Sequence, residues 1–202
     1  MRDYQRIDEY LDRLIKEVYP QPQDDGHTAW ANEAVDKFTK FTGVRKDLSV
    51  LDLGCGEAFL QELFEYLGYS YLGVCLGEDY RVARAKGRKV VHEDFSFLSF
   101  EDNSFDLLFS RHSLEHSPMP LLTLMDWHRI TKRWLALVLP SPVFWEYKGQ
   151  NHYFVLNYEQ WRNLFEKSGF EVTYFHSKTQ NMTTDPEATE VEIELWYLLE
   201  KK

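Results

Sequence analysis

The feature of this 202-residue sequence that most constrains its fold is the stretch Ser49–Glu57, which reads SVLDLGCGE. Its apolar run indicates a buried strand, which is interrupted at Asp52 and then breaks into Gly54-x-Gly56. This order is typical of a parallel strand that turns into a helix, and open α/β sheets bind ligands at the carboxyl ends of such strands. Glycine lets a ligand lie against bare backbone because it has no Cβ. The stretch therefore predicts a site for a nucleotide-like cofactor.

Three interpretations of this loop remain open at this point. A dinucleotide-binding loop would read G-x-G-x-x-G, but Phe59 stands where the third glycine would be. No G-x-x-x-x-G-K-[ST] phosphate loop occurs in the sequence,. The second interpretation is that Asp52, Gly54 and Gly56 form a D-x-G-x-G loop, which would bind a cofactor other than a dinucleotide. An ordinary strand–turn–helix that binds no ligand is the third.

Composition limits the classes of function. The apolar fraction is 44%, which suits one domain with a substantial core,. The net charge of −10 argues against binding nucleic acid through its phosphates,. The two cysteines, Cys55 and Cys75, do not suggest a disulfide framework, so we expect a reducing, cytoplasmic location,. No apolar run approaches the about 20 residues of a membrane span, and the charged amino end lacks the core of a signal peptide. We therefore expect neither a nucleic-acid partner nor a membrane.

Hydrophobic periodicity predicts two amino-terminal helices followed by alternating strands and helices. The first two helices are expected at 7–18 and 28–41, as a helical cap or lid formed by residues 1–43 of a single domain, 1–202. The predicted strands cover 50–53, 71–76, 90–91, 105–110, 134–139, 170–176 and 191–199. The predicted helices between them cover 58–67, 79–86, 121–131 and 158–168. This pattern predicts a Rossmann-like parallel sheet with helices on both faces and an antiparallel hairpin of the last two strands at its edge.

The D-x-G-x-G loop resembles the signature of the class I S-adenosylmethionine-dependent methyltransferases. The resemblance extends over roughly 50–172 and is greatest to the small-molecule, ubiquinone-biosynthesis-like members, methyltransferase type 11. It rests also on VVHEDF at 90–95, on DNSFDLLFS at 102–110 followed by RHSLEHSP, and on WRNLFEKSGFEV at 161–172. Together these segments are more specific than any one of them.

The resemblance implies S-adenosyl-L-methionine as cofactor. In the family, the acidic residue and the loop backbone hold the methionine part of the cofactor. At the end of the third strand, Asp94 would accept from the adenine amino group and Phe95 would lie beside the ring. The implied cofactor-binding residues are Asp52, Gly54, Cys55, Gly56, Glu57, Cys75, Leu76, Glu78, Asp94, Phe95, Ser110 and Arg111.

The sequence departs from the family pattern at two places. Cys75 stands where the family usually has an acid that holds the ribose hydroxyls, and a thiol is a weak partner for a diol. Glu78 or Asp79 would then reach back to the ribose, with Gly77 supplying the turn. The family's Pro-Gly-Gly before the fifth strand is replaced by KRW at 132–134, which puts the local turn in doubt.

Two histidines are candidates for a general base. His112 follows the fourth predicted strand and His152 lies beyond the fifth, so both can approach an acceptor at the carboxyl end of the sheet. Imidazole suits proton removal because its pKa lies near neutrality. His116 is expected to be a hydrogen-bonded structural residue. The i, i+4 spacing of His112 and His116 could suit a metal on a helix, but no third ligand is evident, and we predict no metal site.

The sequence thus predicts an S-adenosylmethionine-dependent methyltransferase that acts on an O, N or C atom of a small-molecule acceptor. The alternative is a methyltransferase-like binding or regulatory module that has lost catalysis, and Cys75 keeps this alternative open. A nucleic-acid methyltransferase is disfavoured by the acidic charge balance,.

Overall fold

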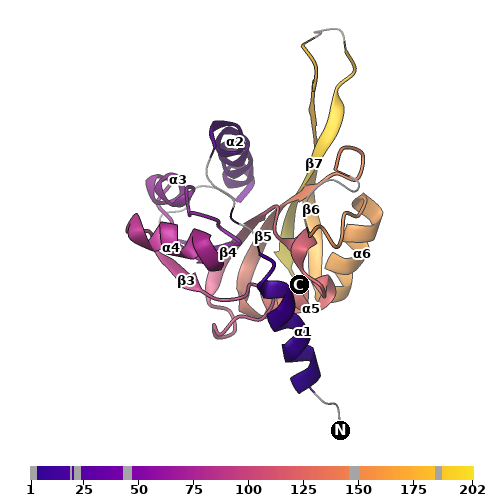
Figure 1. Ribbon diagram of the computed structural model, residues 1–202. Helices are drawn as coiled ribbons and strands as arrows, with labels where there is room; N and C mark the ends of the chain where they lie inside the picture. Colours follow the sequence, from indigo (N-terminus) through magenta and orange to yellow (C-terminus); the bar gives the residue numbers. More distant parts are fainter. Residues whose placement is uncertain (1–3, 19, 21–23, 43–46, 146–150, 185–187) are drawn as a thin grey trace.

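A computed structural model of the chain describes residues 4–18, 20, 24–42, 47–145, 151–184 and 188–202 (Figure 1). Within these residues, seven strands form one sheet: β1 (Ser49–Leu53), β2 (Ser70–Cys75), β3 (Val90–His92), β4 (Phe105–Arg111), β5 (Thr131–Pro140), β6 (Phe170–Gln180) and β7 (Val191–Lys201). The helices are α1 (Gln5–Ile15), α2 (Asp25–Thr42), α3 (Gln61–Tyr66), α4 (Gly77–Ala85), α5 (Pro120–Ile130) and α6 (Tyr158–Ser168), with a short 3-10 turn, η1 (Leu114–His116).

The strand order is β3-β2-β1-β4-β5-β7-β6. The first five strands pair in parallel. Strand β7 runs antiparallel between β5 and β6, so β6 is one of the two edge strands of the sheet and β3 is the other. The predicted Rossmann-like sheet with an antiparallel carboxyl-terminal hairpin is therefore confirmed. The hairpin also extends beyond the rest of the sheet (Figure 1).

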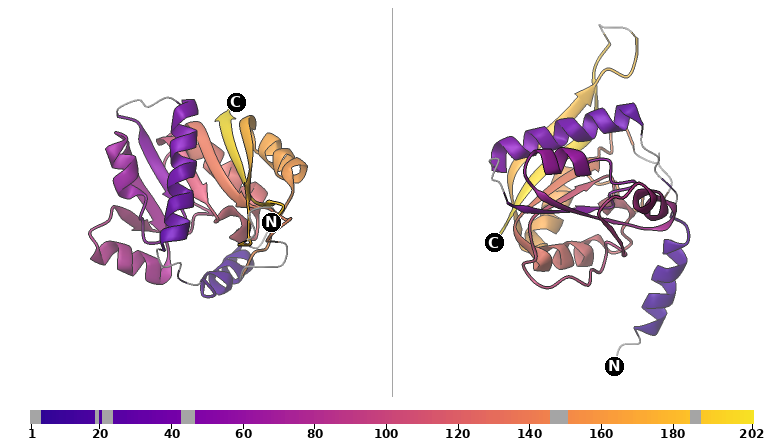
Figure 2. Two further views of the ribbon diagram at one scale, coloured as in Figure 1. Left: turned by 90° about the horizontal axis from the view of Figure 1, so that it is seen from above. Right: turned by 90° about the vertical axis from the view of Figure 1, so that its left-hand side faces the viewer.

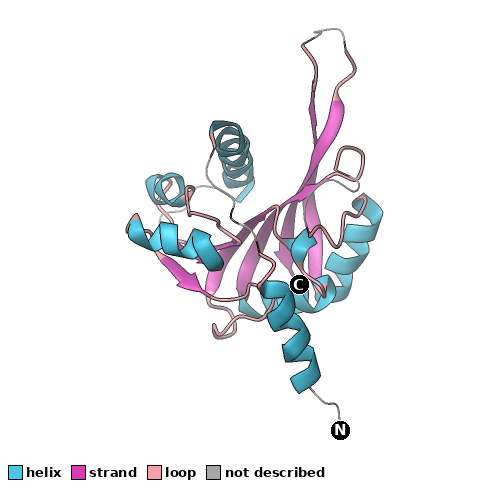
Figure 3. Ribbon diagram, in the orientation of Figure 1, coloured by secondary structure: helices cyan, strands magenta, loops and turns pink. Residues whose placement is uncertain are grey.

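Helices cover both faces of the sheet (Figure 3). Apolar side chains of α2, α3 and α4 share one core cluster, and those of α5 and α6 share the other. Strand β5 contributes to both clusters, because successive side chains along a strand point to opposite faces of the sheet. Ala136 and Val138 belong to the first cluster, and Leu135, Leu137 and Leu139 to the second. Its uninterrupted apolar run is therefore that of a central parallel strand buried on both faces.

Two local features differ from the expectations. The predicted helix 58–67 is helical only in α3, because Ala58 has φ +58°, a left-handed conformation that α-helix excludes,. Strand β5 begins directly after α5, so the segment 132–134 belongs to the strand and forms no separate turn. The irregularity falls in this segment: Phe105 pairs with Thr131 and Leu107 with Trp134, so β5 has one residue more than β4 between the two pairs,. The helix predicted at 158–168 is present as α6, and it ends at Gly169, whose φ of +99° is left-handed,.

The two amino-terminal helices lie in different environments. Helix α2 lies along one face of the sheet (Figure 2) and buries Ala31, Ala34, Val35 and Phe38 against it. Helix α1 buries no residue fully and extends away from the sheet. Of the predicted cap, residues 1–3, 19, 21–23 and 43 lie outside the described residues, and its action as a lid stays a prediction. No helix in the described part of the chain is long and apolar enough to cross a bilayer.

The packing of α2 predicts that this helix is an integral layer of the domain. The ring of Phe38 is 1% exposed and lies 6.4 Å from that of Phe109 and 6.2 Å from that of Trp196, centroid to centroid. We expect Phe38→Ala to lower the free energy of unfolding by about 3–5 kcal/mol, because it leaves a cavity between helix and sheet. The control Tyr66→Ala, at a side chain 86% exposed, should change it by no more than about 0.5 kcal/mol,. Equal values from urea unfolding of the two variants would show that α2 is only loosely attached.

Candidate functional site

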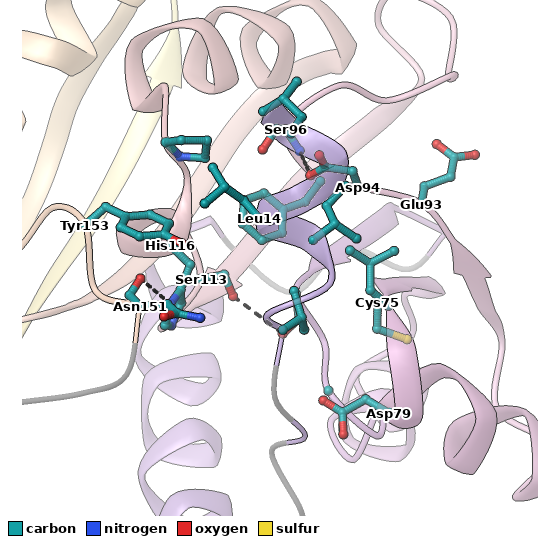
Figure 4. A pocket seen from close by; sticks show the side chains of 18 of the residues that line it. Leu14, Cys75, Asp79, Glu93, Asp94, Ser96, Ser113, His116, Asn151 and Tyr153 are labelled. Carbon is teal, nitrogen blue, oxygen red and sulfur yellow. Dashed lines mark hydrogen bonds between the residues drawn. The ribbon is translucent and has the colours of Figure 1, made fainter. Parts of the chain in front are cut away.

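A cleft opens at the carboxyl ends of β1, β2, β3 and β4, and α1 lies against it (Figure 4). Its empty space, counted out to open solvent, is about 950 Å³. Apolar side chains of α1, among them Leu11, Leu14 and Ile15, form part of its wall.

The glycine loop after β1 forms one wall of the cleft. Gly54 has φ +71° and Gly56 has φ +54°, a left-handed conformation that favours glycine,. The amides of Gly54 and Cys55 both donate to the carbonyl oxygen of Val74, which fixes the loop against the end of β2. A Cβ on Gly54 would lie 2.2 Å from the Ser113 hydroxyl oxygen, so this position has room only for glycine. The loop therefore presents backbone, and not side chains, to the cleft.

Three of the predicted loop contacts point elsewhere. Asp52 is 3% exposed and accepts a hydrogen bond from the Tyr71 hydroxyl at 2.9 Å, within the sheet below the cleft. Burial raises its pKa to about 7, although the bond from Tyr71 opposes the shift. The Cys55 thiol packs beside Gly73, where a Cβ would lie 2.6 Å from the sulfur. Glu57 pairs with Lys86 on the far side of the loop.

The end of β2 brings one carboxylate to the cleft. Cys75 and Leu76 line it, as predicted from the sequence, and Asp79 lines it beside them with 8% exposure. Glu78 has a side chain 53% exposed and pairs with Arg81 at 2.9 Å. Of the two carboxylates left open by the sequence, Asp79 is the one that faces the cleft (Figure 4).

The end of β3 supplies a second carboxylate and an aromatic ring. Asp94 and Phe95 both line the cleft. Oδ1 of Asp94 accepts from the Ser96 amide at 2.8 Å, which fixes the side chain at the turn. The neighbouring Glu93 also lines the cleft but accepts from the amide and the hydroxyl of Ser99. Asp94, predicted from the sequence, thus lies at the wall of the cleft together with the ring of Phe95.

His112, directly after β4, belongs to the described lining of the cleft, whereas Ser110 and Arg111 at the end of β4 do not. Ser110 is 1% exposed within the sheet. Nη2 of Arg111 donates to Oε1 of Glu194 at 2.7 Å, and Nε2 of His112 lies 2.9 Å from the same oxygen. Burial alone would raise the pKa of Glu194, but the bond from His112 and the charge of Arg111 lower it to about 2. Glu194 is therefore an ionised acceptor, and Nε2 of His112 carries the proton.

The state of His112 follows from this bond. Its pKa is lowered by burial, against the opposing effect of Glu194. The neutral ring then carries its lone pair on Nδ1. His112 also has φ +49°, a strained conformation for a residue with a side chain, and such strain is common at functional sites,.

His152 lies behind the wall of the cleft and does not belong to its described lining. Its side chain is 7% exposed and its ring packs against His116, with centroids 4.8 Å apart, and against Trp145 at 5.9 Å. Burial, and then the charges of His116 and His112, lower its pKa to about 4. His116 is hydrogen-bonded, as expected, with Nδ1 2.9 Å from the carbonyl oxygen of Asn151.

Two buried carboxylates near the cleft, those of Glu194 and Glu115, were not predicted from the sequence as site residues. Glu194 on β7 lies 82 positions from His112, and the pattern of β7 contains no signal for their contact. Glu115 lies in η1, fully buried, with its Oε1 3.7 Å from Nδ1 of His112. It stands directly before His116 in the LEH segment, so its place in the sequence could have indicated a role.

Comparison with known proteins identifies relatives of the central region. Residues 51–136 match a family model described as "Methyltransferase domain". A sterol 24-C-methyltransferase of Neurospora crassa is 33% identical over 87 residues, 38% of this chain and 23% of the relative. A demethylmenaquinone methyltransferase of Staphylococcus aureus is 29% identical over 142 residues, 65% of this chain and 55% of the relative. The chain thus spans about half or less of the length of these curated relatives.

Solved structures share the fold at low sequence identity. Magnesium protoporphyrin IX methyltransferase from Synechocystis PCC 6803, with bound SAH (S-adenosylhomocysteine), superposes with a TM-score of 0.69 at 14% identity. The match covers 99% of this chain and all of that one. A SAM-dependent methyltransferase (SAM, S-adenosylmethionine) from Aquifex aeolicus gives 0.64 at 19% identity over 83% and 89% of the two chains.

The burial of Asp52 predicts a specific dependence of stability on pH. In the unfolded chain its carboxyl ionises near pH 3.9, whereas in the folded protein it keeps its proton up to about pH 7. Its contribution to the free energy of unfolding is therefore fully present below about pH 4 and is lost by the time the pH has risen through about 7. Between these values the free energy of unfolding falls by up to roughly 1.4 kcal/mol per pH unit. Asp52→Asn cannot ionise, so this variant should gain stability relative to the native protein between pH 5 and pH 8.

Urea unfolding of the ligand-free proteins at the two pH values measures this difference. The matched control is Asp106→Asn. Burial raises the pKa of Asp106, but the two hydrogen bonds from Ser49 leave it below the ordinary value. This carboxyl is ionised at both pH values, so its variant should leave the pH dependence unchanged. The same pH dependence in Asp52→Asn and the native protein would show that Asp52 is ionised in the fold.

Proposed function

We propose that this chain methylates an O, N or C atom of a small-molecule acceptor. By its fold and by the match of residues 51–136, it belongs to the class I S-adenosylmethionine-dependent methyltransferases. The supporting observation is that one cleft combines the glycine loop with Asp79, Asp94 and His112, from the ends of four strands. A cleft at this edge is where parallel α/β sheets bind ligands.

The residues of the cleft fit the chemistry of S-adenosylmethionine. Hydroxyl and amino groups donate hydrogen bonds, and carboxylates accept them. Asp79 would therefore hold the ribose hydroxyls, and Asp94 the adenine amino group with Phe95 against the ring. The backbone of Gly54 and Gly56 would lie along the methionine part. When bound, the cofactor supplies a methyl group on a sulfonium sulfur, which is already an activated leaving group.

Alignment of the acceptor is then the main task of the protein, and in well-oriented systems it supplies up to about 7–11 kcal/mol. The apolar side chains of α1 would exclude water from the cleft,. Where the acceptor must lose a proton, Nδ1 of His112 would receive it, because Glu194 keeps the other ring nitrogen protonated,. His152, the second base suggested by the sequence, would act from behind the wall and is the weaker candidate.

The alternative of an inactive binding module rested on Cys75. Asp79, which lines the cleft, would supply the carboxylate that Cys75 lacks, and its position argues against the loss of catalysis. The relatives named for sterol, demethylmenaquinone and magnesium protoporphyrin substrates support a small organic acceptor for this chain too. The two buried free cysteines are in keeping with a reducing, cytoplasmic compartment,.

Calorimetry with S-adenosylmethionine, S-adenosylhomocysteine and NAD tests cofactor binding. We expect both adenosyl ligands to bind and NAD to give no heat. Gly56→Val should abolish binding, because its side chain would enter the cleft. The control Gly87→Val carries the same strain, at φ +74°, but has no atoms near its Cβ and lies outside the cleft, so it should bind normally. Binding of NAD alone would overturn the proposal.

The proposed contact between Asp79 and the ribose predicts the effect of a substitution at this residue. Asp79→Asn should weaken S-adenosylhomocysteine binding by at least about tenfold, since a hydrogen bond to a charged group is worth about 1.5–3 kcal/mol. Glu78→Gln, the exposed neighbour, should change affinity by less than about twofold. A loss confined to Glu78→Gln, or to Cys75→Ala, would show that the ribose contact is misassigned.

A further inference from the structure

A group of side chains that can ligate a cation lies beside the cleft. Glu115 and His116 belong to η1, and His152 belongs to a segment that follows β5. One potential ligand atom from each of the three lies within 4.8 Å of the others. The proposed methyl transfer gives neither Glu115 nor His116 a role.

One member of this group, Glu115, has buried polar atoms with no hydrogen-bond partner in the described part of the chain. Glu115 is 0% exposed, and neither of its carboxylate oxygens has a hydrogen-bond partner among the described residues. A buried polar atom without a partner costs about 1–3 kcal/mol, and more if it is charged. Such atoms are rare in native proteins and call for a partner such as a water or an ion.

The backbone holds the group in place. The amides of Tyr153 and Phe154 both donate to the carbonyl oxygen of Glu115, at 2.9 and 3.1 Å. Nδ1 of His116 donates to the carbonyl oxygen of Asn151 at 2.9 Å. Histidine ligands of metals usually donate their second nitrogen to such a carbonyl, which fixes the tautomer and the orientation of the ring. Nε2 is therefore the atom that His116 directs to the group.

We propose that Glu115, His116 and His152 bind one divalent transition-metal cation. Two imidazoles and one carboxylate are the donor set of many such sites, and they leave coordination positions open for a substrate. Oε1 of Glu115 lies 4.0 Å from Nε2 of His152, so a small closing movement would bring both to bonding distance of a shared ion. From the sequence alone, His112 and His116 were considered as a ligand pair and no metal site was predicted; the proposed site instead combines His116 with Glu115 and His152.

The position of the cation site beside the cleft indicates a class of methyl acceptor. This inference rests on the proposed methyltransferase function. His116, Asn151 and Tyr153 line the cleft on the side away from Cys75 and Asp94 (Figure 4). The open positions of the cation would therefore face the acceptor and not the adenosine. A bound cation lowers the pKa of a hydroxyl that ligates it. This favours an acceptor with an ionisable hydroxyl group over an amine or a carbon acid.

The corresponding transfer balances as follows. The hydroxyl proton of the acceptor passes to Nδ1 of His112, and the oxygen that remains on the cation attacks the methyl carbon. The carbon–sulfur bond breaks with its electron pair kept by sulfur, which gives a methyl ether and S-adenosylhomocysteine. His112 thus keeps the role assigned above, and the cation binds beside it.

Cobalt binding tests the site without any assay of activity. Untagged protein is freed of metal with a chelator and titrated with Co²⁺, followed by visible absorption and equilibrium dialysis. We expect one Co²⁺ per chain. Glu115→Gln and His116→Gln should each weaken binding by about 100-fold or more, since loss of an outer partner alone costs about 10–100-fold. The control His128→Gln removes a histidine that has an unpartnered nitrogen but lies outside the group.

A further measurement needs no variant. The ring of Trp145 lies 5.9 Å from that of His152, so bound Co²⁺ should quench tryptophan fluorescence of the native protein. Absence of both the absorption band and the quenching would overturn the site, as would native affinity in Glu115→Gln. Calorimetry with S-adenosylhomocysteine on the same samples separates the two proposals. If the protein binds S-adenosylhomocysteine but not Co²⁺, the metal site is wrong and the methyltransferase proposal stands. If it binds Co²⁺ but not S-adenosylhomocysteine, the methyltransferase proposal is wrong and the metal site stands.

Discussion

The hydrogen bonds of the buried carboxylate of Glu194 are the interactions on which the side of the cleft around His112 depends. It accepts hydrogen bonds from Arg111, His112 and the indole of Trp196, at 2.7–2.9 Å. Removing one partner of a buried ion pair typically costs about 3–5 kcal/mol, because an uncompensated charge remains. Three donors converge here on one carboxylate, so its negative charge is balanced without water. This ties β7 to the segment after β4 and thereby fixes the histidine that faces the cleft.

The antiparallel insertion of β7 is what makes this contact geometrically available. Strand β7 pairs with β5 along its length, and Pro140 lies opposite Glu194. A shift of one residue in this register would turn Glu194 to the other face of the sheet. It would also exchange the buried apolar side chains of β7 between the two core clusters. The packing of the core therefore enforces the register, and the register places the charge.

The two sides of the cleft are built by different means. The side proposed for the cofactor consists of backbone at Gly54 and Gly56 and of carboxylates at the ends of β2 and β3, each a few residues from its strand. The acceptor side consists of side chains from segments far apart in the chain, joined by hydrogen bonds such as that from His116 to Asn151. A common cofactor can be met by a local motif, whereas an individual acceptor requires a surface assembled from several loops.

The sequence by itself determined the strands, most of the helices, the glycine loop and the selection of Asp94, because apolar periodicity and the conformational freedom of glycine act over a few residues. It also predicted the fold class from the alternation of elements. It could not choose between Glu78 and Asp79, since only the turn into α4 directs one of them to the cleft. It could not place His152 behind the wall, bring Glu194 to His112 or gather Glu115 with two histidines. These contacts join residues up to 82 positions apart, and only the packed sheet, through its register and its two cores, fixes such distances.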